Sequence, residues 1–360
     1  MSIVFHTNIV SPHQLPWCIE FSELHSGGFT YLAEEGMHAE RRAMGWGAGE
    51  GYDFVSIADD ASRRELKSCD VLISTFRELD VFKRRARSGL RSIYMFERWF
   101  KPPLGRLRLF HPGYWLMCRR FAQLCKVGGI ELLPIGIHAA EDIQHVVGDT
   151  VMMLPWGYFV KPSTETEPSQ MESGRVKLLW CGRMLDWKRV DTLVKATVRL
   201  LETGVNLELK LIGHGPEERY LRQLASGWDE QIIFGDNLPI GEIRREMRET
   251  GIYVLSSDGG EGWGAVVNEA MCEGCLVVGT HEAGSSATMI RDGVNGLLYH
   301  AGDVDGLTRV LGKAVELVQD ESGMAMRQAA MATMTGEWSP RQAAIRLLEF
   351  IRTSKQGAGS

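Results

Sequence analysis

Short apolar runs alternate with amphipathic stretches along the chain, which is the pattern of parallel α/β sheets. In the first half, this pattern predicts strands at 3–7, 54–57, 71–74, 92–96, 131–134 and 151–154. In the second half, it predicts strands at 176–181, 207–212, 232–234, 253–255 and 276–278. Apolar residues at helical spacing lie between them, and Ser339-Pro340 is expected to start a last helix that runs to about Thr353.

The domain organisation follows from the chain length and from one interruption of this pattern. A chain of 360 residues favours two domains over one. Residues 161–174 contain two prolines and no apolar periodicity, so they are the predicted linker. We expect two doubly wound, Rossmann-like domains at 1–160 and 175–337. Residues 338–360 should form a helix that crosses back to the N-terminal domain and ends in a frayed tail.

Composition narrows the class of protein. With 44% hydrophobic and 24% charged residues, the chain is an ordinary globular protein. Its start lacks the features of a secretory signal, and no uncharged apolar stretch reaches eighteen residues. Seven scattered cysteines indicate reduced thiols, so a cytoplasmic location is expected. The net charge of −6 argues against general nucleic-acid binding.

The charge is unevenly distributed. Between residues 83 and 126, twelve Lys or Arg side chains stand against one acid, Glu97, and aromatic and aliphatic residues are interleaved with them. Two interpretations remain open. The segment is a solvated basic face, or it binds an anionic partner such as a phospholipid surface or a pyrophosphate-linked acceptor. The second interpretation implies peripheral contact with the inner face of a membrane.

A glycine-rich loop between two predicted strands is the most informative segment. It contains Glu261 and leads into a helix, expected to start near Trp263, that carries Glu269 on its second turn. Glycines let backbone N–H groups approach an anion closely, and a helix N-terminus favours negative charge. The rise from Gly264 to Glu269 is roughly 7–8 Å. Each carboxylate suits a pair of hydroxyls, because an ionised carboxylate accepts two hydrogen bonds at once.

A second segment places cations at a sheet edge. The predicted strand 176–181 runs into Gly182, Arg183 and Lys188, in the loop where open α/β sheets bind ligands. Two fixed cations there would neutralise a diphosphate without a metal. No metal-ligand spacing of His or Cys and no Asp-x-Asp strand end is present in the sequence, so neither a metal nor another cofactor is expected.

Together these motifs resemble the donor-binding domain of glycosyltransferase family 4. The pattern is Gly182-Arg183-x4-Lys188 followed by Glu261-x7-Glu269, and the resemblance covers about 175–307. Further matching segments are 211–216, 233–235, 269–274 and 292–298. The resemblance implies the retaining GT-B class, in which two Rossmann-like domains face each other across a cleft.

The resemblance also implies residue roles. Arg183 and Lys188 would hold the diphosphate, Glu269 the ribose and Glu261 the transferred sugar. The backbone amides of Gly262, Trp263 and Gly264 would help to hold the sugar and phosphate, and the stretch Phe234, Gly235 to Leu238 would face the base. By contrast, Gly213-x-Gly215 lacks the third glycine of a dinucleotide fingerprint and indicates a tight turn.

The N-terminal half matches the family more loosely. It lacks the paired glycines that many members carry after the first strand. His13 and Gln14, Glu97 and Arg98, and the segment 155–159 resemble members from surface-polysaccharide assembly. These four residues are the acceptor-side candidates. Glu97, which follows a predicted strand, either binds the acceptor or stabilises a cationic sugar, or it pairs with Arg98 or another arginine.

The expected function is therefore transfer of a hexosyl or other glycosyl unit from a nucleotide-diphosphate sugar, UDP or GDP, to a glycan, a glycolipid or another hydroxyl. Arg183, Lys188, Glu261 and Glu97 are the catalytic candidates. Three alternatives remain open: a GT-B nucleotide-sugar epimerase, a non-catalytic sugar-nucleotide sensor, and a glycosyltransferase acting on modified DNA. The epimerase would need a catalytic acid, for which Glu97 is the candidate.

Overall fold

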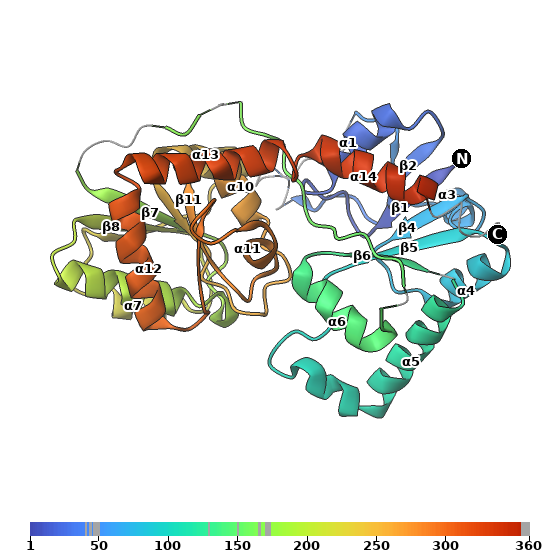
Figure 1. Ribbon diagram of the computed structural model, residues 1–360, viewed down its shortest axis with the longest axis horizontal. Coiled ribbons are helices and arrows are strands. Elements are labelled where there is room, and N and C mark those ends of the chain that lie inside the picture. The colour runs from blue at the N-terminus through green and yellow to red at the C-terminus, as the bar shows by residue number, and fades with distance from the viewer. Residues whose placement is uncertain are drawn as a thin grey trace. The chain divides into compact units, whose positions relative to one another are not determined.

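The computed structural model describes residues 1–39, 42, 45, 51–128, 130–149, 151–164, 167–169 and 174–353. The predicted frayed tail and parts of the predicted linker lie outside these residues. The chain divides into two compact units (Figure 1): unit 1 comprises Met1–Val160 and Pro340–Ser360, and unit 2 comprises Lys161–Ser339.

Unit 1 is built on a six-stranded parallel sheet in the order β3-β2-β1-β4-β5-β6. Its strands are β1 Ile3–Thr7, β2 Phe29–Ala33, β3 Val55–Ile57, β4 Val71–Ser74, β5 Arg91–Phe96 and β6 Glu131–Pro134. Its helices are α1 Leu15–Leu24, α3 Asp60–Glu65, α4 Leu79–Arg87, η2 Gly105–Phe110, α5 Pro112–Lys126, α6 Ile137–Val147 and α14 Pro340–Thr353. The central strands are buried throughout, as expected for a parallel sheet covered on both faces.

Unit 2 has a second six-stranded parallel sheet in the order β12-β11-β10-β7-β8-β9. Its strands are β7 Val176–Cys181, β8 Leu207–Ile212, β9 Ile232–Gly235, β10 Ile252–Val254, β11 Leu276–Thr280 and β12 Leu297–Tyr299. Its helices are η3 Asp186–Lys188, α7 Val190–Glu202, α8 Glu218–Leu224, α9 Ile240–Glu249, α10 Val266–Cys272, α11 Gly284–Met289, α12 Val304–Leu317 and α13 Glu321–Thr335. Helix α7 packs with α12, and α10 packs with α13 (Figure 1).

The last helix belongs to unit 1, where α14 lies along α1 (Figure 1). It buries an apolar face against that unit, and Arg341 forms an ion pair with Glu20 at 3.1 Å. The buried residues of this face include Ala343, Ala344, Leu347, Leu348 and Ile351. The chain therefore leaves unit 1 after Val160 and returns to it at Pro340.

The strand predictions differ from the structure in three places. Residues 151–154 form no strand; the segment meets β6 only at isolated bridges, such as Leu132 with Met153. Pro155 follows at once and has no N–H to donate, which interrupts the ladder. Strands β2 and β12 were not predicted; β2 follows α1 after the short segment 25–28, and β12 is only three residues long.

The described parts of the predicted linker are attached to unit 2. The Ser163 hydroxyl donates to Glu273 at 3.0 Å, and Arg244 donates to the Lys161 carbonyl at 2.9 Å. Glu273 is buried and also pairs with Arg248 at 2.6 Å. In the described part of the chain, no helix combines the length and the apolar character needed to cross a membrane.

Candidate functional site

The loops that follow β7 and β8 in unit 2 pack backbone against backbone. Gly213 has a φ of +126°, and a Cβ added there would collide with the carbonyl oxygen of Gly182. A Cβ on Gly215 would collide with Met184 in the same way. The amide of Gly182 donates to the Ile212 carbonyl at 3.0 Å. Glycine is therefore required at both positions, and the contact holds the loop that carries Arg183 and Lys188 in place.

Lys188 and Glu261 meet at the carboxyl edge of this sheet, although 73 residues separate them in the chain. Their side chains form an ion pair, with exposed fractions of 16% and 12%. The Ser257 hydroxyl donates to the same Glu261 carboxylate at 3.0 Å, and Ser256 donates to the Lys188 carbonyl at 2.7 Å. The structure thus joins the two sequence motifs through a largely buried, hydrogen-bonded pair of opposite charges.

Arg183 and Glu269 are placed differently from this pair. Arg183 is exposed, and its guanidinium makes no hydrogen bond or ion pair with the described residues. Glu269 is buried, with 6% of its surface exposed. Burial raises the pKa of the Cys181 thiol to about 12, and the nearby Glu269 carboxylate adds to this effect. That thiol therefore stays protonated beside the site and is not a candidate nucleophile.

The helix that carries Glu269 begins later than the sequence predicted. Helix α10 starts at Val266 instead of near Trp263, so Glu269 lies in its first turn and not in the second. The residues before it form a glycine loop, and the Trp263 ring is buried, with its Nε1 donating to Asn268 at 2.8 Å. This hydrogen bond anchors the loop to the helix.

Two backbone amides of the glycine loop have no hydrogen-bond acceptor among the described residues. Within the described residues, the amides of Gly262 and Gly264 donate no hydrogen bond. The loop is supported from the other side, where the Ser285 hydroxyl donates to the Gly264 carbonyl at 2.9 Å. Unsatisfied amides in a fixed loop are suited to binding oxygen atoms of an anion or a sugar.

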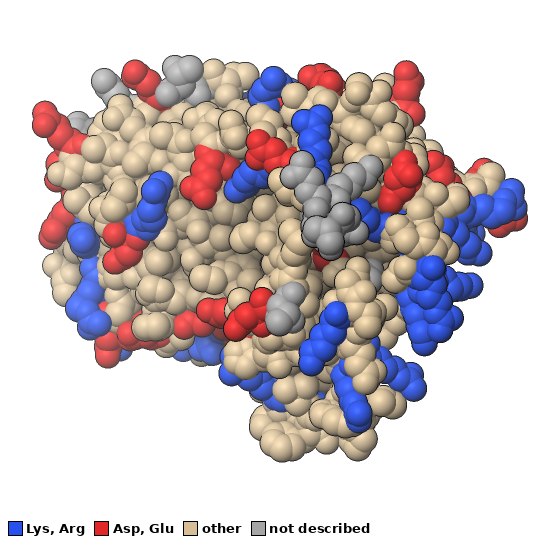
Figure 2. Space-filling view, turned by 45° about the vertical axis from the view of Figure 1, so that its right-hand side comes forward, with Lys and Arg blue, Asp and Glu red and all other residues tan. Residues whose placement is uncertain are grey.

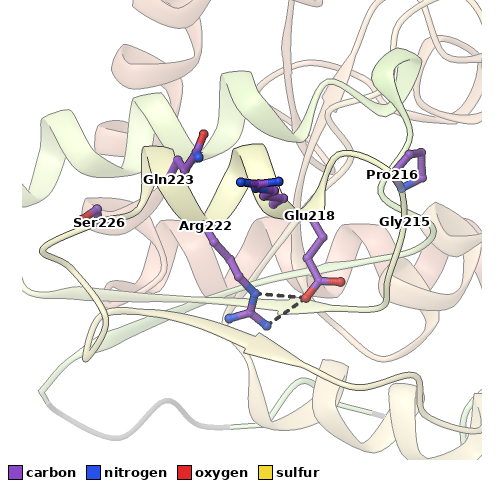
Figure 3. Close-up of a pocket in the computed structure, with 7 residues that line it drawn as sticks. Gly215, Pro216, Glu218, Arg222, Gln223 and Ser226 are labelled. Carbon is purple, nitrogen blue, oxygen red and sulfur yellow. Dashed lines mark hydrogen bonds and ion pairs between the residues drawn. The ribbon is translucent and has the colours of Figure 1, made fainter.

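The residues expected to face a base lie at the end of β9. Phe234, Gly235 and Leu238 are half-buried, and the Arg222 guanidinium lies 4.4 Å from the centre of the Phe234 ring. A shallow hollow of about 780 Å³ lies over α8 (Figure 3), where Arg222 also pairs with Glu218 at 2.9 Å. None of the donor-binding candidates lines this hollow.

Three of the four acceptor-side candidates, His13, Glu97 and Arg98, lie near the end of β5. The Glu97 carboxylate accepts a hydrogen bond from the Tyr158 hydroxyl at 2.8 Å and pairs with Lys101 at 3.0 Å. The His13 ring stacks on Tyr158 with 6.0 Å between ring centres. Arg98 pairs with the buried Asp142 at 3.6 Å. The partner of Glu97 is thus a lysine, instead of the arginine that the sequence suggested.

Gln14 is placed differently from the other acceptor-side candidates. It is buried; its side-chain oxygen accepts a hydrogen bond from the Trp17 ring N–H at 2.5 Å, and its side-chain nitrogen donates to the Met95 sulfur at 3.5 Å. These contacts use the amide inside the core of unit 1. A role in binding an acceptor stays a prediction for this residue.

A cavity of about 510 Å³ surrounds Glu97 in unit 1. Four cations line it with this single carboxylate: Arg77, Arg98, Lys101 and Arg108. The Nε1 of Trp99 and the Nε of Arg108 are buried there without a partner among the described residues. Arg77 lies over the Trp99 ring at 4.9 Å. The cavity is therefore cationic, which suits an anionic ligand.

Sequence reasoning missed several residues of these sites. Tyr158 lies within a segment that the sequence singled out, but nothing in its spacing revealed the bond to Glu97. Arg77 follows β4 as Glu97 follows β5, and neighbouring parallel strands end at the same sheet edge, so this signal was present in the sequence. Among the described residues, no group of three or more His, Cys, Asp or Glu side chains is arranged to hold a metal ion.

Comparison with solved structures identifies the fold. HepE of Anabaena in complex with UDP superposes with a TM-score of 0.73 at 13% identity, over 98% of this chain and 100% of that chain. The apo form of the lipopolysaccharide outer core galactosyltransferase WaaB gives a TM-score of 0.71 at 16% identity, over 98% and 100%. At these identities the likeness shows the fold alone, which is the GT-B fold of glycosyltransferases.

The second half of the chain also resembles known proteins in sequence. Residues 175–317 match the family model described as Glycosyl transferases group 1. A similar protein is the GDP-mannose-dependent monoacylated alpha-(1-6)-phosphatidylinositol monomannoside mannosyltransferase of Corynebacterium glutamicum, 27% identical over 56% of this chain and 55% of that protein. Another is the lipopolysaccharide core biosynthesis glycosyltransferase LpsE of Rhizobium meliloti, 32% identical over 44% of each chain. The alignments span 33–55% of the first four curated relatives.

Proposed function

We propose that the protein is a retaining glycosyltransferase that moves a sugar from a nucleotide-diphosphate sugar to an acceptor hydroxyl, in polysaccharide or glycoconjugate assembly. The observation that carries the proposal is the contact between Lys188 and Glu261 within the family-matched region. One is a cation suited to a diphosphate and the other is a carboxylate suited to sugar hydroxyls. Their contact brings the two halves of a nucleotide-sugar site together.

The reaction requires one bond to form and one to break. The acceptor oxygen bonds the anomeric carbon, the bond from that carbon to the phosphate oxygen breaks, and the acceptor proton passes to the leaving diphosphate. Lys188 and Arg183 stabilise the charge that accumulates on the diphosphate. Glu261 orients the sugar, and Glu269 holds the ribose hydroxyls. No protein nucleophile is needed, because the contribution of the protein is orientation and charge stabilisation.

The cavity around Glu97 is the proposed acceptor site. Its four cations favour an acceptor that carries a phosphate or carboxylate group close to the reacting hydroxyl. Similar proteins are named for phosphatidylinositol monomannoside and for lipopolysaccharide core, which are anionic glycoconjugates. Glu97 would orient the acceptor hydroxyl, and Tyr158 and Lys101 would keep its carboxylate in place.

A panel of nucleotide sugars tests the proposal. At 100 times its Kd, the true donor stabilises the folded protein by about 2.7 kcal/mol, which raises the melting temperature. Both UDP- and GDP-sugars belong in the panel, because HepE was solved with UDP and the similar mannosyltransferase is GDP-mannose-dependent. Glycosyl transfer to an anionic acceptor supports the proposal. Epimerised donor, or donor binding without turnover in the presence of acceptors, would instead indicate an epimerase or a sensor.

Transfer activity is expected to be unchanged by EDTA. Arg183 and Lys188 supply two positive charges at the proposed diphosphate position, so a divalent ion is not needed there. The measurement is the initial rate of transfer with chelator, with Mn²⁺ added back as the control. Loss of the rate in EDTA, together with its recovery in Mn²⁺, would contradict the proposed role of the two cations.

A further inference from the structure

A cluster of exposed apolar side chains projects from unit 1. Of the fourteen large hydrophobic side chains that are exposed in the described chain, six fall between residues 104 and 127. Phe110 is 83% exposed and Leu107 is 62% exposed. The other four are Leu104, Trp115, Leu116 and Val127. We call residues 101–127, which include η2 and α5, the η2–α5 surface. Because η2 and α5 pack together, most of these side chains gather on one part of the domain, and exposed apolar side chains gathered in this way mark an interaction site.

This exposure is a property of an ordered surface. Helix α5 buries Cys118, Phe121 and Cys125 on its inner face. The Phe121 ring lies 5.0 Å from the Trp99 ring, and the Tyr114 hydroxyl donates to the Trp99 carbonyl at 3.1 Å. The inner face of the helix is therefore fixed by packing against unit 1, while Trp115 and Leu116 remain on its outer face.

The same surface is strongly cationic. Glu97 and Glu131 are the nearest acids on either side along the chain, so no acid lies within residues 98–130. The Arg119 guanidinium lies 5.4 Å from the centre of the Trp115 ring, which places a cation directly beside an exposed aromatic. The cations of the surface are Lys101, Arg106, Arg108, Arg119, Arg120 and Lys126. In the lower part of Figure 2, blue side chains flank a tan surface.

We propose that the η2–α5 surface docks unit 1 on an anionic lipid bilayer. Phe110, Leu107 and Leu104 would enter the boundary between head groups and acyl chains, and the flanking cations would contact lipid phosphates. The exposed apolar side chains favour a bilayer over a nucleic acid as the binding partner. A phosphate backbone pairs with the arginines but leaves Leu104, Leu107 and Phe110 in water, whereas a bilayer satisfies both kinds of side chain.

The location of the surface agrees with the proposed acceptor site. Lys101, Arg108 and Tyr114 of this surface also line the cavity around Glu97. A bilayer held at the η2–α5 surface would present the head group of an anionic, lipid-linked acceptor beside this cavity. This last step rests on the proposed function, whereas the docking itself does not.

Sedimentation with lipid vesicles tests the docking. The full chain should pellet with phosphatidylglycerol-containing vesicles at low ionic strength, and much less with pure phosphatidylcholine vesicles or in high salt. The double variants Leu107→Ala/Phe110→Ala and Arg106→Ala/Arg120→Ala should each lower the partition coefficient about tenfold or more. The matched controls in unit 1, Ile57→Ala/Met152→Ala and Arg64→Ala/Lys67→Ala, should bind as the wild type does.

Each other outcome overturns the docking. These outcomes are a wild type that stays in the supernatant, equal pelleting with neutral vesicles, and surface variants that bind like the wild type. If the protein binds heparin more tightly than vesicles, and only the arginine variant loses this binding, the partner of the surface is a soluble polyanion instead of a bilayer. Thermal stabilisation of every variant by the nucleotide sugar is measured in parallel. Because that readout depends on unit 2, failure of docking and failure of the proposed function are distinguishable.

Discussion

Replacement of Lys188 by alanine is expected to lower kcat for sugar transfer about 100- to 1000-fold, with a much smaller rise in the donor KM. The negative charge on the leaving diphosphate grows as the glycosidic bond breaks. A cation beside it therefore stabilises the transition state more than the bound donor, and such an interaction appears in kcat. Steady-state kinetics with varied donor at saturating acceptor measure both parameters.

The ion pair with Glu261 requires a control for folding. Removal of Lys188 leaves a largely buried carboxylate without its cation, which by itself lowers stability. The thermal midpoint of the variant is therefore compared with that of Lys195→Ala, which removes a lysine paired with Asp191 on the more exposed surface of α7. Lys195→Ala should retain its kcat. A Lys188→Ala protein that is folded and changes only in KM would show that Lys188 binds the ground state.

Replacement of Glu269 by alanine is expected to weaken nucleotide-sugar binding about 10- to 100-fold. Its carboxylate should accept hydrogen bonds from the ribose diol, and a hydrogen bond to a charged group contributes about 1.5–3 kcal/mol. Titration calorimetry gives the donor Kd directly. The nucleoside diphosphate without its sugar should lose the same factor, because it retains the ribose.

The same substitution at an exposed glutamate of unit 2 serves as the control for nonspecific effects on donor binding. Glu242 is an exposed glutamate in the first turn of α9, and Glu242→Ala should leave the donor Kd unchanged. Glu269→Gln retains the side-chain shape and one acceptor, so its loss should fall between those of the wild type and alanine. Equal donor affinity in Glu269→Ala and the wild type would remove Glu269 from the ribose site.

The sequence alone determined most of the fold of unit 2 and the identity of its candidate site. Strands such as β7 and β8 carry apolar patterns long enough to identify, and Gly182, Lys188, Glu261 and Glu269 follow strand ends in a recognisable order. These signals are local, because they depend on residue type and spacing. Some elements were less visible: β2 and the three-residue β12 were missed, and α10 begins three residues later than expected because a glycine loop precedes it.

The tertiary structure decided which side chains meet. Glu97 is adjacent to Arg98 in the sequence, yet its carboxylate lies against Lys101 and Tyr158, while Arg98 reaches Asp142. The spacing of Lys188 and Glu261 indicated one ligand, but only the parallel order of β7 and β10 brings their two loops into contact. The sequence also left open whether the basic segment was merely solvated. Burial of one face of α5 decides which of its apolar residues remain exposed, because that choice depends on packing partners distant in the chain.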